Sequence, residues 1–184
     1  MQNDRWQRYT AAWRELSGVR PLDHPSFSSV SRVWRAEMHP TFHDDVVITL
    51  TDIDAGGWIE LRVVPAAVRA WAMAAAGMGA PAHGDPPAAR VWEEAVSADA
   101  LDGVAAAMPR LPLHSTNEGG RDGMTVYHEA AVDGVTHRFS SWSPTHARAP
   151  LHHAYIVALC TLAARRFADP AAQAAVQAIA AYLR

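Results

Sequence analysis

Histidine is the residue type in this sequence most suited to chemistry, because the 184-residue chain contains 10 histidines. His39 and His43 lie 4 positions apart, and Asp44 and Asp45 follow them directly. On a helix this spacing would place both imidazoles on one face, as in many zinc sites. Pro40 and the strand-like sequence on either side oppose a helix, so a metal site of His39, His43 and Asp45 would have to form from a folded loop. A polar loop between two strands is the simpler interpretation.

Other nucleophiles and phosphate-binding motifs are not organised into a recognisable site. Residues 140–143 supply three serines ahead of His146, but the GxSxG elbow is absent, and a triad is built in space rather than along the sequence. Cys160 lies in a helical apolar pattern, where a small buried hydrophobe is the expected role. The glycines of residues 119–123 lack the Lys-Ser/Thr ending of a P-loop. The sequence therefore predicts no catalytic residue and no cofactor.

A β-hairpin is the clearest element of the sequence. Asp133-Gly134 is a strong two-residue turn signal between two alternating segments, 125–132 and 135–142. The turn fixes the register, so Glu129 should lie opposite Arg138. One hairpin face is mostly apolar and is expected to cover the core: Val126, His128, Ala130, Val132, Val135, His137 and Phe139. If its two histidines are buried, they should make stability depend on pH.

The opposite hairpin face carries the predicted binding residues, which are Tyr127, Glu129, Arg138 and Trp142. Glu129 and Arg138 are expected to form a cross-strand ion pair worth up to about 1 kcal/mol. Tyr, Trp and Arg are common anchors of protein interfaces. Trp142 has two open alternatives, namely exposure at an interface or cover by the terminal helices.

The remaining elements must hold this hairpin in place. Strands are expected at 30–38, 46–52, 58–64 and 91–96, and short turns between the first three favour an antiparallel meander. Helices are expected up to residue 16, at 66–76, 98–108 and 150–167, and after Asp169, with Pro170 in the first helical position. We therefore predict one α+β domain over residues 1–184, with an antiparallel sheet of five to six strands, an N-terminal helix and C-terminal helices packed on it.

The first helix carries an aromatic stripe. Trp6, Tyr9, Trp13 and Leu16 recur at helical spacing, which predicts packing against the core. An exposed aromatic surface for a partner is the alternative.

Composition removes several functional classes. The net charge is −3, from 16 basic and 19 acidic residues, so the basic stripe of a dedicated nucleic-acid binder is not expected. No apolar run approaches the roughly 18 residues of a membrane span, and the first residues do not resemble a secretory signal. One cysteine excludes an internal disulfide framework. A cytoplasmic protein is the expectation.

The segment Arg121-Asp122-Gly123 to Glu129, the second hairpin strand and Trp142-Ser143-Pro144 form a pattern. This pattern resembles a group of small bacterial α+β proteins with a DG strand, a hairpin and a W-S-P ending. Residues 33–40 look like their first strand, and the resemblance covers about two thirds of the chain. It implies a fold and carries no activity.

Two functions from different classes follow from these observations. The first is a non-enzymatic protein-binding module, in its specific form an immunity or inhibitor protein that neutralises a bacterial toxin. It rests on the absence of a coherent catalytic constellation and on the aromatic and arginine face of the hairpin. The alternative is a small metal-dependent hydrolase that uses the histidine-rich loops.

Overall fold

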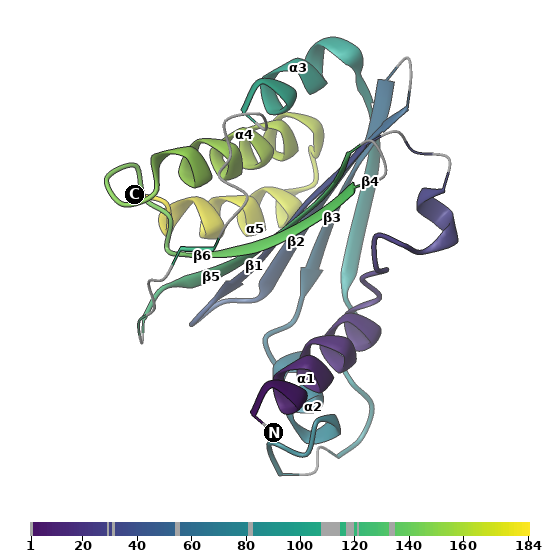
Figure 1. The fold of residues 1–184 in the computed structure, drawn as a ribbon, viewed down its shortest axis with the longest axis vertical. Helices are drawn as coiled ribbons and strands as arrows, with labels where there is room; N and C mark the ends of the chain where they lie inside the picture. The colour runs from purple at the N-terminus through teal and green to yellow at the C-terminus, as the bar shows by residue number, and fades with distance from the viewer. Residues whose placement is uncertain are drawn as a thin grey trace.

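The computed structural model describes residues 2–28, 30, 32–53, 56–80, 83–107, 115–116, 120, 122–132 and 135–184. These residues form one antiparallel sheet of 6 strands in the order β4-β3-β2-β1-β5-β6 (Figure 1). The strands are β1 (Arg32–Pro40), β2 (Asp45–Ile53), β3 (Gly56–Val64), β4 (Arg90–Ser97), β5 (Met124–Val132) and β6 (Val135–Trp142). The helices are α1 (Gln2–Ser17), the short 3-10 helix η1 (Pro25–Phe27), α2 (Val68–Ala75), α3 (Ala98–Ala107), α4 (Pro150–Arg166) and α5 (Pro170–Ala181). The predicted α+β class and sheet are confirmed.

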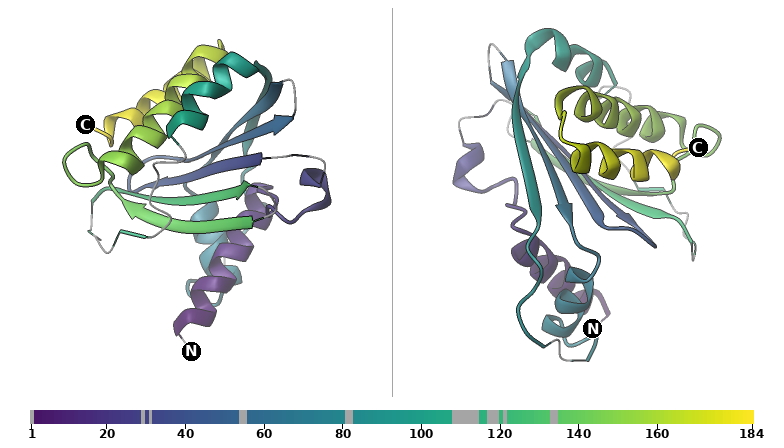
Figure 2. Two further views of the ribbon diagram at one scale, coloured as in Figure 1. Left: turned by 45° about the horizontal axis from the view of Figure 1, so that its top comes forward. Right: turned by 180° about the vertical axis from the view of Figure 1, so that it is seen from behind.

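Helices lie on both sides of the sheet. Figures 1 and 2 show α4 and α5 against one face, with α3 beside them, and α1 with α2 on the other side. The first face is the larger apolar core, to which β1 contributes Trp34, Ala36 and Met38, all buried. The intervening residues of β1 point to the second face, because side chains alternate along a strand. That face carries Arg35, Glu37 and His39 together with a second apolar cluster that includes Trp13 of α1, and it is the face that α1 covers. No helix among the described residues is long and apolar enough to cross a membrane.

The β5–β6 hairpin has the predicted register. His128 lies opposite Phe139, and Glu129 lies opposite Arg138, while the turn residues 133–134 are outside the described residues. β5 also pairs with β1, which ends at Pro40 instead of the predicted residue 38. The extra length arises because the last residues of β1 pair with β5 and not with β2. Such a distant partner cannot be read from local sequence.

α1 packs through only part of its aromatic stripe. Trp13 is 1% exposed and belongs to a second apolar cluster with Val68 and Ala72 of α2, whereas Trp6 is 50% exposed. The packing prediction is therefore confirmed for Trp13, whereas Trp6 is exposed, as the alternative interpretation of the stripe expected. Gly18 ends α1 with φ of +68°, a conformation that glycine adopts without a steric penalty.

His128 is buried in the large core and is held in a neutral state. Its ring stacks on Phe139 with centroids 4.7 Å apart, and its Nε2 lies 2.9 Å from Ser141 Oγ. Burial, with a smaller contribution from the nearby His152, lowers the pKa of His128 to about 3. Cys160 is also buried, as predicted, and burial raises the pKa of its thiol to about 12.

His128 is expected to make the protein less stable in mild acid. Its pKa in the folded state, about 3, is below the 6.5 of the unfolded chain, so protonation favours unfolding. The contribution of neutral His128 to the free energy of unfolding is fully present above pH 6.5. It decreases as the pH falls toward 3, by about 2 kcal/mol between pH 7 and pH 5. Urea denaturation across this pH range would measure the loss. In His128→Gln, which can keep the contact with Ser141, most of this pH dependence should disappear.

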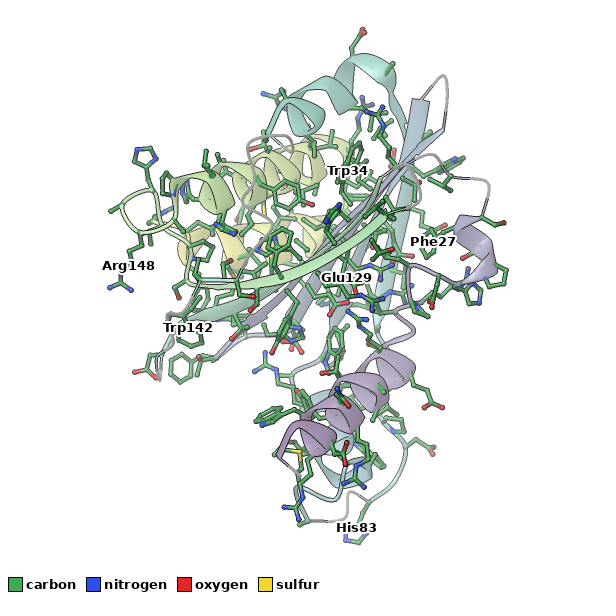
Figure 3. All side chains as sticks on the ribbon, viewed as in Figure 1. Phe27, Trp34, His83, Glu129, Trp142 and Arg148 are labelled. Carbon is green, nitrogen blue, oxygen red and sulfur yellow. The ribbon has the colours of Figure 1, made fainter. Side chains whose placement is uncertain are left out.

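His83 provides the control for this experiment. It is exposed on the loop after α2, far from the core in Figure 3, and His83→Gln should keep the loss of stability seen in the native chain. An unchanged pH dependence in His128→Gln would show that other groups cause it.

Candidate functional site

The predicted binding residues of the hairpin have different environments. Tyr127 is 43% exposed, and the Arg138 side chain is 57% exposed. Glu129 lies on the same hairpin face, as alternation predicts, but it is only 2% exposed. Figure 3 shows Glu129 over the middle of the sheet. It is buried because Arg14 of α1 and Arg35 of β1 reach across the polar face to its carboxylate.

Trp142 lies at the far end of β6 from the turn and is half-buried. A Cβ added at Gly120 would lie 2.8 Å from Trp142 Nε1, and one added at Gly123 would lie 2.8 Å from Cζ2. The chain just before β5 therefore passes tightly against the indole. This segment covers Trp142, in place of the terminal helices that were one predicted alternative. Figure 3 places Trp142 away from Glu129, so the four predicted residues do not form one cluster.

The Glu129 carboxylate binds three arginines. Its Oε1 lies 2.9 Å from Arg14 Nη2 and accepts a hydrogen bond from Arg138 Nε at 2.8 Å. Its Oε2 accepts from Arg35 Nη1 at 3.1 Å. Arg35 also donates from Nε to Thr49 Oγ1 at 3.1 Å and from Nη1 to the Arg20 carbonyl at 2.7 Å. The predicted Glu129–Arg138 ion pair is thus one contact within a larger network of charged side chains around the buried Glu129.

Glu37 extends this network along β1. Its Oε1 lies 2.8 Å from Arg14 Nη2, so Arg14 joins Glu37 and Glu129. Burial raises the pKa of Glu37, and the charge of Arg14 opposes this shift. Burial lowers the pKa of Arg35, with Glu129 opposing. For Arg14, burial alone would lower the pKa, but Glu37 and Glu129 together raise it. The paired charges thus oppose the effect of burial on the pKa values of Glu37 and Arg35, and they reverse it for Arg14.

Asp45 forms a second buried network at the start of β2. It is 0% exposed and accepts hydrogen bonds from Trp13 Nε1 and Arg69 Nε, both at 3.0 Å. Arg69 Nη2 makes a further ion pair with Asp45 Oδ1, and His39 Nδ1 lies 3.2 Å from that oxygen. Burial alone would raise the pKa of Asp45, but His39 and Arg69 hold it below its usual value. This carboxylate joins α1, β1, β2 and α2.

The predicted metal residues do not converge. His39 and Asp45 come together, but His43 is exposed and its Nδ1 lies 2.8 Å from Tyr182 Oη, beyond the end of α5. His39 lies in β1 and His43 lies in the β1–β2 connection, so His39 contacts Asp45 whereas His43 contacts Tyr182. Within the described ranges, no group of three or more His, Cys, Asp or Glu side chains is placed to hold a metal ion. The prediction of a composite site at His39, His43 and Asp45 is therefore wrong.

Several buried polar atoms beneath α1 lack hydrogen-bond partners. They are Arg14 Nε, Glu37 Oε1 and His39 Nε2. Glu37 Oε1 has the ion-pair contact with Arg14 but no well-directed hydrogen bond. Buried polar atoms are usually paired, and exceptions cluster at sites that take up water or a ligand.

A groove of ≈ 920 Å³ opens between α1 and the hairpin, and Arg14 is one of the residues that line it. We call it the α1–hairpin groove. Trp6, Thr10 and Arg14 line it from α1, and Tyr127, Glu129 and Arg138 line it from β5 and β6. It therefore joins three of the four predicted binding residues to two residues of α1. Trp6 belongs to the stripe for which an exposed aromatic surface was one alternative, and Arg14 was not assigned to a site by sequence reasoning. In β1, Arg35, Glu37 and His39 occupy alternate positions, which indicates a polar face of the strand. The pattern does not show that this face is buried.

The chain was compared with known proteins at three levels. No model of a protein family matches it, and no match was found among curated proteins or among solved structures. The resemblance of residues 121–144 to small bacterial α+β proteins stays a prediction. The candidate site therefore rests on its own geometry, in which a buried network of arginine and glutamate forms the floor of the α1–hairpin groove.

Proposed function

We propose that the chain is a non-enzymatic protein-binding module whose α1–hairpin groove holds a segment of another protein. The observation that carries this proposal is the exposure of Trp6, Tyr127 and Arg138 along one groove. Trp6 is 50% exposed, Tyr127 is 43% exposed and the Arg138 side chain is 57% exposed. Residues of these three types dominate the energetics of protein interfaces when they become desolvated.

The floor of the groove favours binding without large rearrangement. Arg138 is held at Nε by Glu129, which Arg14 and Arg35 fix in turn. A side chain held in place loses less conformational entropy when a partner binds. His39 Nε2 is buried without a hydrogen-bond partner, and the His39 ring lies 5.4 Å from that of Tyr127, which lines the groove. A bridging water or a polar group of a partner can pair with such an atom.

The size and charge of the groove favour a peptide segment over a nucleic acid. Its volume of ≈ 920 Å³ is near the upper end of small-molecule sites, which hold about 300–1,000 Å³. Arg14 and Arg138 line it together with Glu15, Asp23 and Glu129, so neither sign of charge dominates. Neutralisation of a toxin is the specific form of this proposal, because an inhibitor needs a complementary surface and no catalytic groups of its own.

Site-specific photo-crosslinking tests this function in the native cell. A photoreactive phenylalanine analogue placed at position 6 or 127 should capture the same protein, because both side chains line one groove. Phe42 is the control, since it is 70% exposed but lies outside the groove. Capture of different proteins at positions 6 and 127, or equal capture of one protein at position 42, would contradict the proposal.

Binding of the captured partner should depend strongly on Tyr127. We expect Tyr127→Ala to weaken the complex about 10-fold or more, because loss of a central interface aromatic costs about 2 kcal/mol. Isothermal titration calorimetry with purified proteins would measure this change, with Phe42→Ala as the matched variant. If the partner is a toxin, co-production should restore growth for the native chain and not for Tyr127→Ala.

A further inference from the structure

A row of polar side chains crosses the sheet from β1 to β4. Arg35 of β1 lies opposite Thr49 of β2, Thr49 lies opposite Glu60 of β3, and Glu60 lies opposite Glu93 of β4. All four residues line a cavity of ≈ 330 Å³, a volume within the range of small-molecule sites. We call it the β1–β4 cavity. None of the described residues that line it also lines the α1–hairpin groove.

Arg35 brings a desolvated guanidinium to one end of this cavity. The side chain is 2% exposed, and its hydrogen bonds use Nε, to Thr49, and Nη1, to the Arg20 carbonyl and to Glu129. No hydrogen bond from Nη2 occurs among the described residues. The network behind it joins three arginines to only two carboxylates, Glu129 and Glu37. A further carboxylate beside Arg35 would therefore bind a charged donor that is not yet compensated.

The other charges of the lining leave one base and one acid unpaired. Glu60 and Arg62 neutralise each other through contacts of 3.2 and 3.1 Å. Arg20 and Glu93 are exposed, and neither has an ion pair among the described side chains. Arg20 belongs to the end of the cavity at which its carbonyl binds Arg35, whereas Glu93 belongs to the β4 end. The cavity therefore has a basic end and an acidic end.

The spacing of the two ends matches a short zwitterion. Neighbouring strands lie about 4.8 Å apart, so Thr49, which holds Arg35 at Nε, and Glu93 are separated by about 10 Å. A dipeptide is about 7 Å long, and hydrogen bonds at its ends complete this distance. Trp58 also lines the cavity and is 52% exposed, so its indole can take up an apolar side chain.

We propose that the β1–β4 cavity binds a small zwitterion of dipeptide size. Its carboxylate binds Arg35 and Arg20, its ammonium group binds Glu93, and its apolar side chain packs on Trp58. A purely basic group does not fit, because three arginines line the cavity beside its two glutamates. The site is separate from the α1–hairpin groove, and the inference does not depend on the proposed function.

Glycyl-leucine is the probe for this inference, and two derivatives are its controls. Glycyl-leucinamide lacks the carboxylate, and N-acetyl-glycyl-leucine lacks the ammonium group. Isothermal titration calorimetry with the full chain should show binding of glycyl-leucine and about tenfold weaker binding, or less, for each derivative, because each loses a charge-assisted contact. In NMR spectra, the Arg35 Nε–Hε signal should shift with glycyl-leucine and not with its amide.

Variants of the exposed charges assign the two ends of the ligand. Arg20→Gln should reduce the preference for glycyl-leucine over its amide, and Glu93→Gln should reduce the preference over the acetylated compound. Arg148→Gln and Glu94→Gln are the matched controls, since both residues are exposed and lie outside the cavity, and they should change neither preference.

Three results would overturn the proposal. The first is no binding of glycyl-leucine, and the second is equal affinity for glycyl-leucine and either derivative. The third is binding that leaves the Arg35 signal unchanged or that responds equally to Glu93→Gln and Glu94→Gln. Tighter binding of the acetylated compound would assign the cavity to a simple anion and overturn the zwitterion as well.

Discussion

Replacement of Glu129 with alanine is expected to lower the free energy of unfolding by about 3–5 kcal/mol. Glu129 is 2% exposed and is the shared acceptor of Arg14, Arg35 and Arg138. Arg35 is itself 2% exposed. Its buried charge would lose its nearest carboxylate, and that uncompensated charge is the main source of the loss. Urea denaturation at neutral pH would measure the effect.

Glu60→Ala is the matched control for this prediction. Glu60 also lies on the polar face and also binds an arginine, Arg62, but the side chains of the pair are 26% and 15% exposed. We expect Glu60→Ala to cost at most about 1 kcal/mol, as exposed ion pairs do. A double variant, Glu129→Leu with Arg35→Met, should lose less than the sum of the two single changes, since no buried charge is left alone. Equal losses for Glu129→Ala and Glu60→Ala would show that burial of the network does not matter.

Replacement of Asp45 with asparagine is expected to cost a similar amount, about 3–5 kcal/mol. The change keeps the size of the side chain and an oxygen that can accept from Trp13 Nε1, but it removes the negative charge that pairs with Arg69 and lies beside His39. Because these residues come from α1, α2 and β1, the loss should appear as early hydrogen exchange in α1 and α2. Urea denaturation combined with amide exchange would measure both effects.

The neighbouring Asp44 provides the control. It is exposed and accepts one hydrogen bond, from Ala66 N at 2.9 Å, so Asp44→Asn should cost about 1 kcal/mol or less. The effect of the Asp45→Asn substitution should also depend on pH in the acid range. The pKa of Asp45 is held below its unfolded value of 3.8, so its contribution is present above pH 3.8 and is lost as the pH falls through the folded value. The stability difference between the native chain and Asp45→Asn should therefore shrink below pH 4, and a constant difference would contradict this account.

Local patterns predicted the hairpin and its register correctly. A two-residue Asp133-Gly134 turn between two alternating segments sets one register for the hairpin. In that register Glu129 lies opposite Arg138, as the structure shows. Asp169 and Pro170 were equally informative, because a side-chain cap and proline at the first position act within one helical turn. The Asp169 side chain accepts from Ala171 N and Ala172 N as such a cap should. The expectation of five to six strands followed from the same kind of short-range evidence, but the pairing of β1 with β5 did not.

The candidate site could be predicted only in part, because its environment depends on distant segments. Alternation correctly separated Tyr127, Glu129 and Arg138 from the apolar hairpin face. It could not show that α1 would cover the polar face and bury Glu129, since Arg14 and Glu129 are far apart in sequence. The error at His43 has the same origin. Proximity to His39 along the chain suggested a shared site, but the β1–β2 connection directs His43 toward Tyr182.

The pairing of β1 with β5 has a consequence for the order in which the protein can be completed during synthesis. β1, β2 and β3 follow one another closely and can pair as soon as they leave the ribosome, but β1 then keeps an open side until β5 has been made. Arg35 and Glu129 are separated by 94 positions, so the nascent chain carries Arg14, Arg35 and Glu37 for most of its growth without the carboxylate that joins them. Arg35 therefore gains this carboxylate only after β5 has been made, whereas Arg14 and Glu37 can pair before that point.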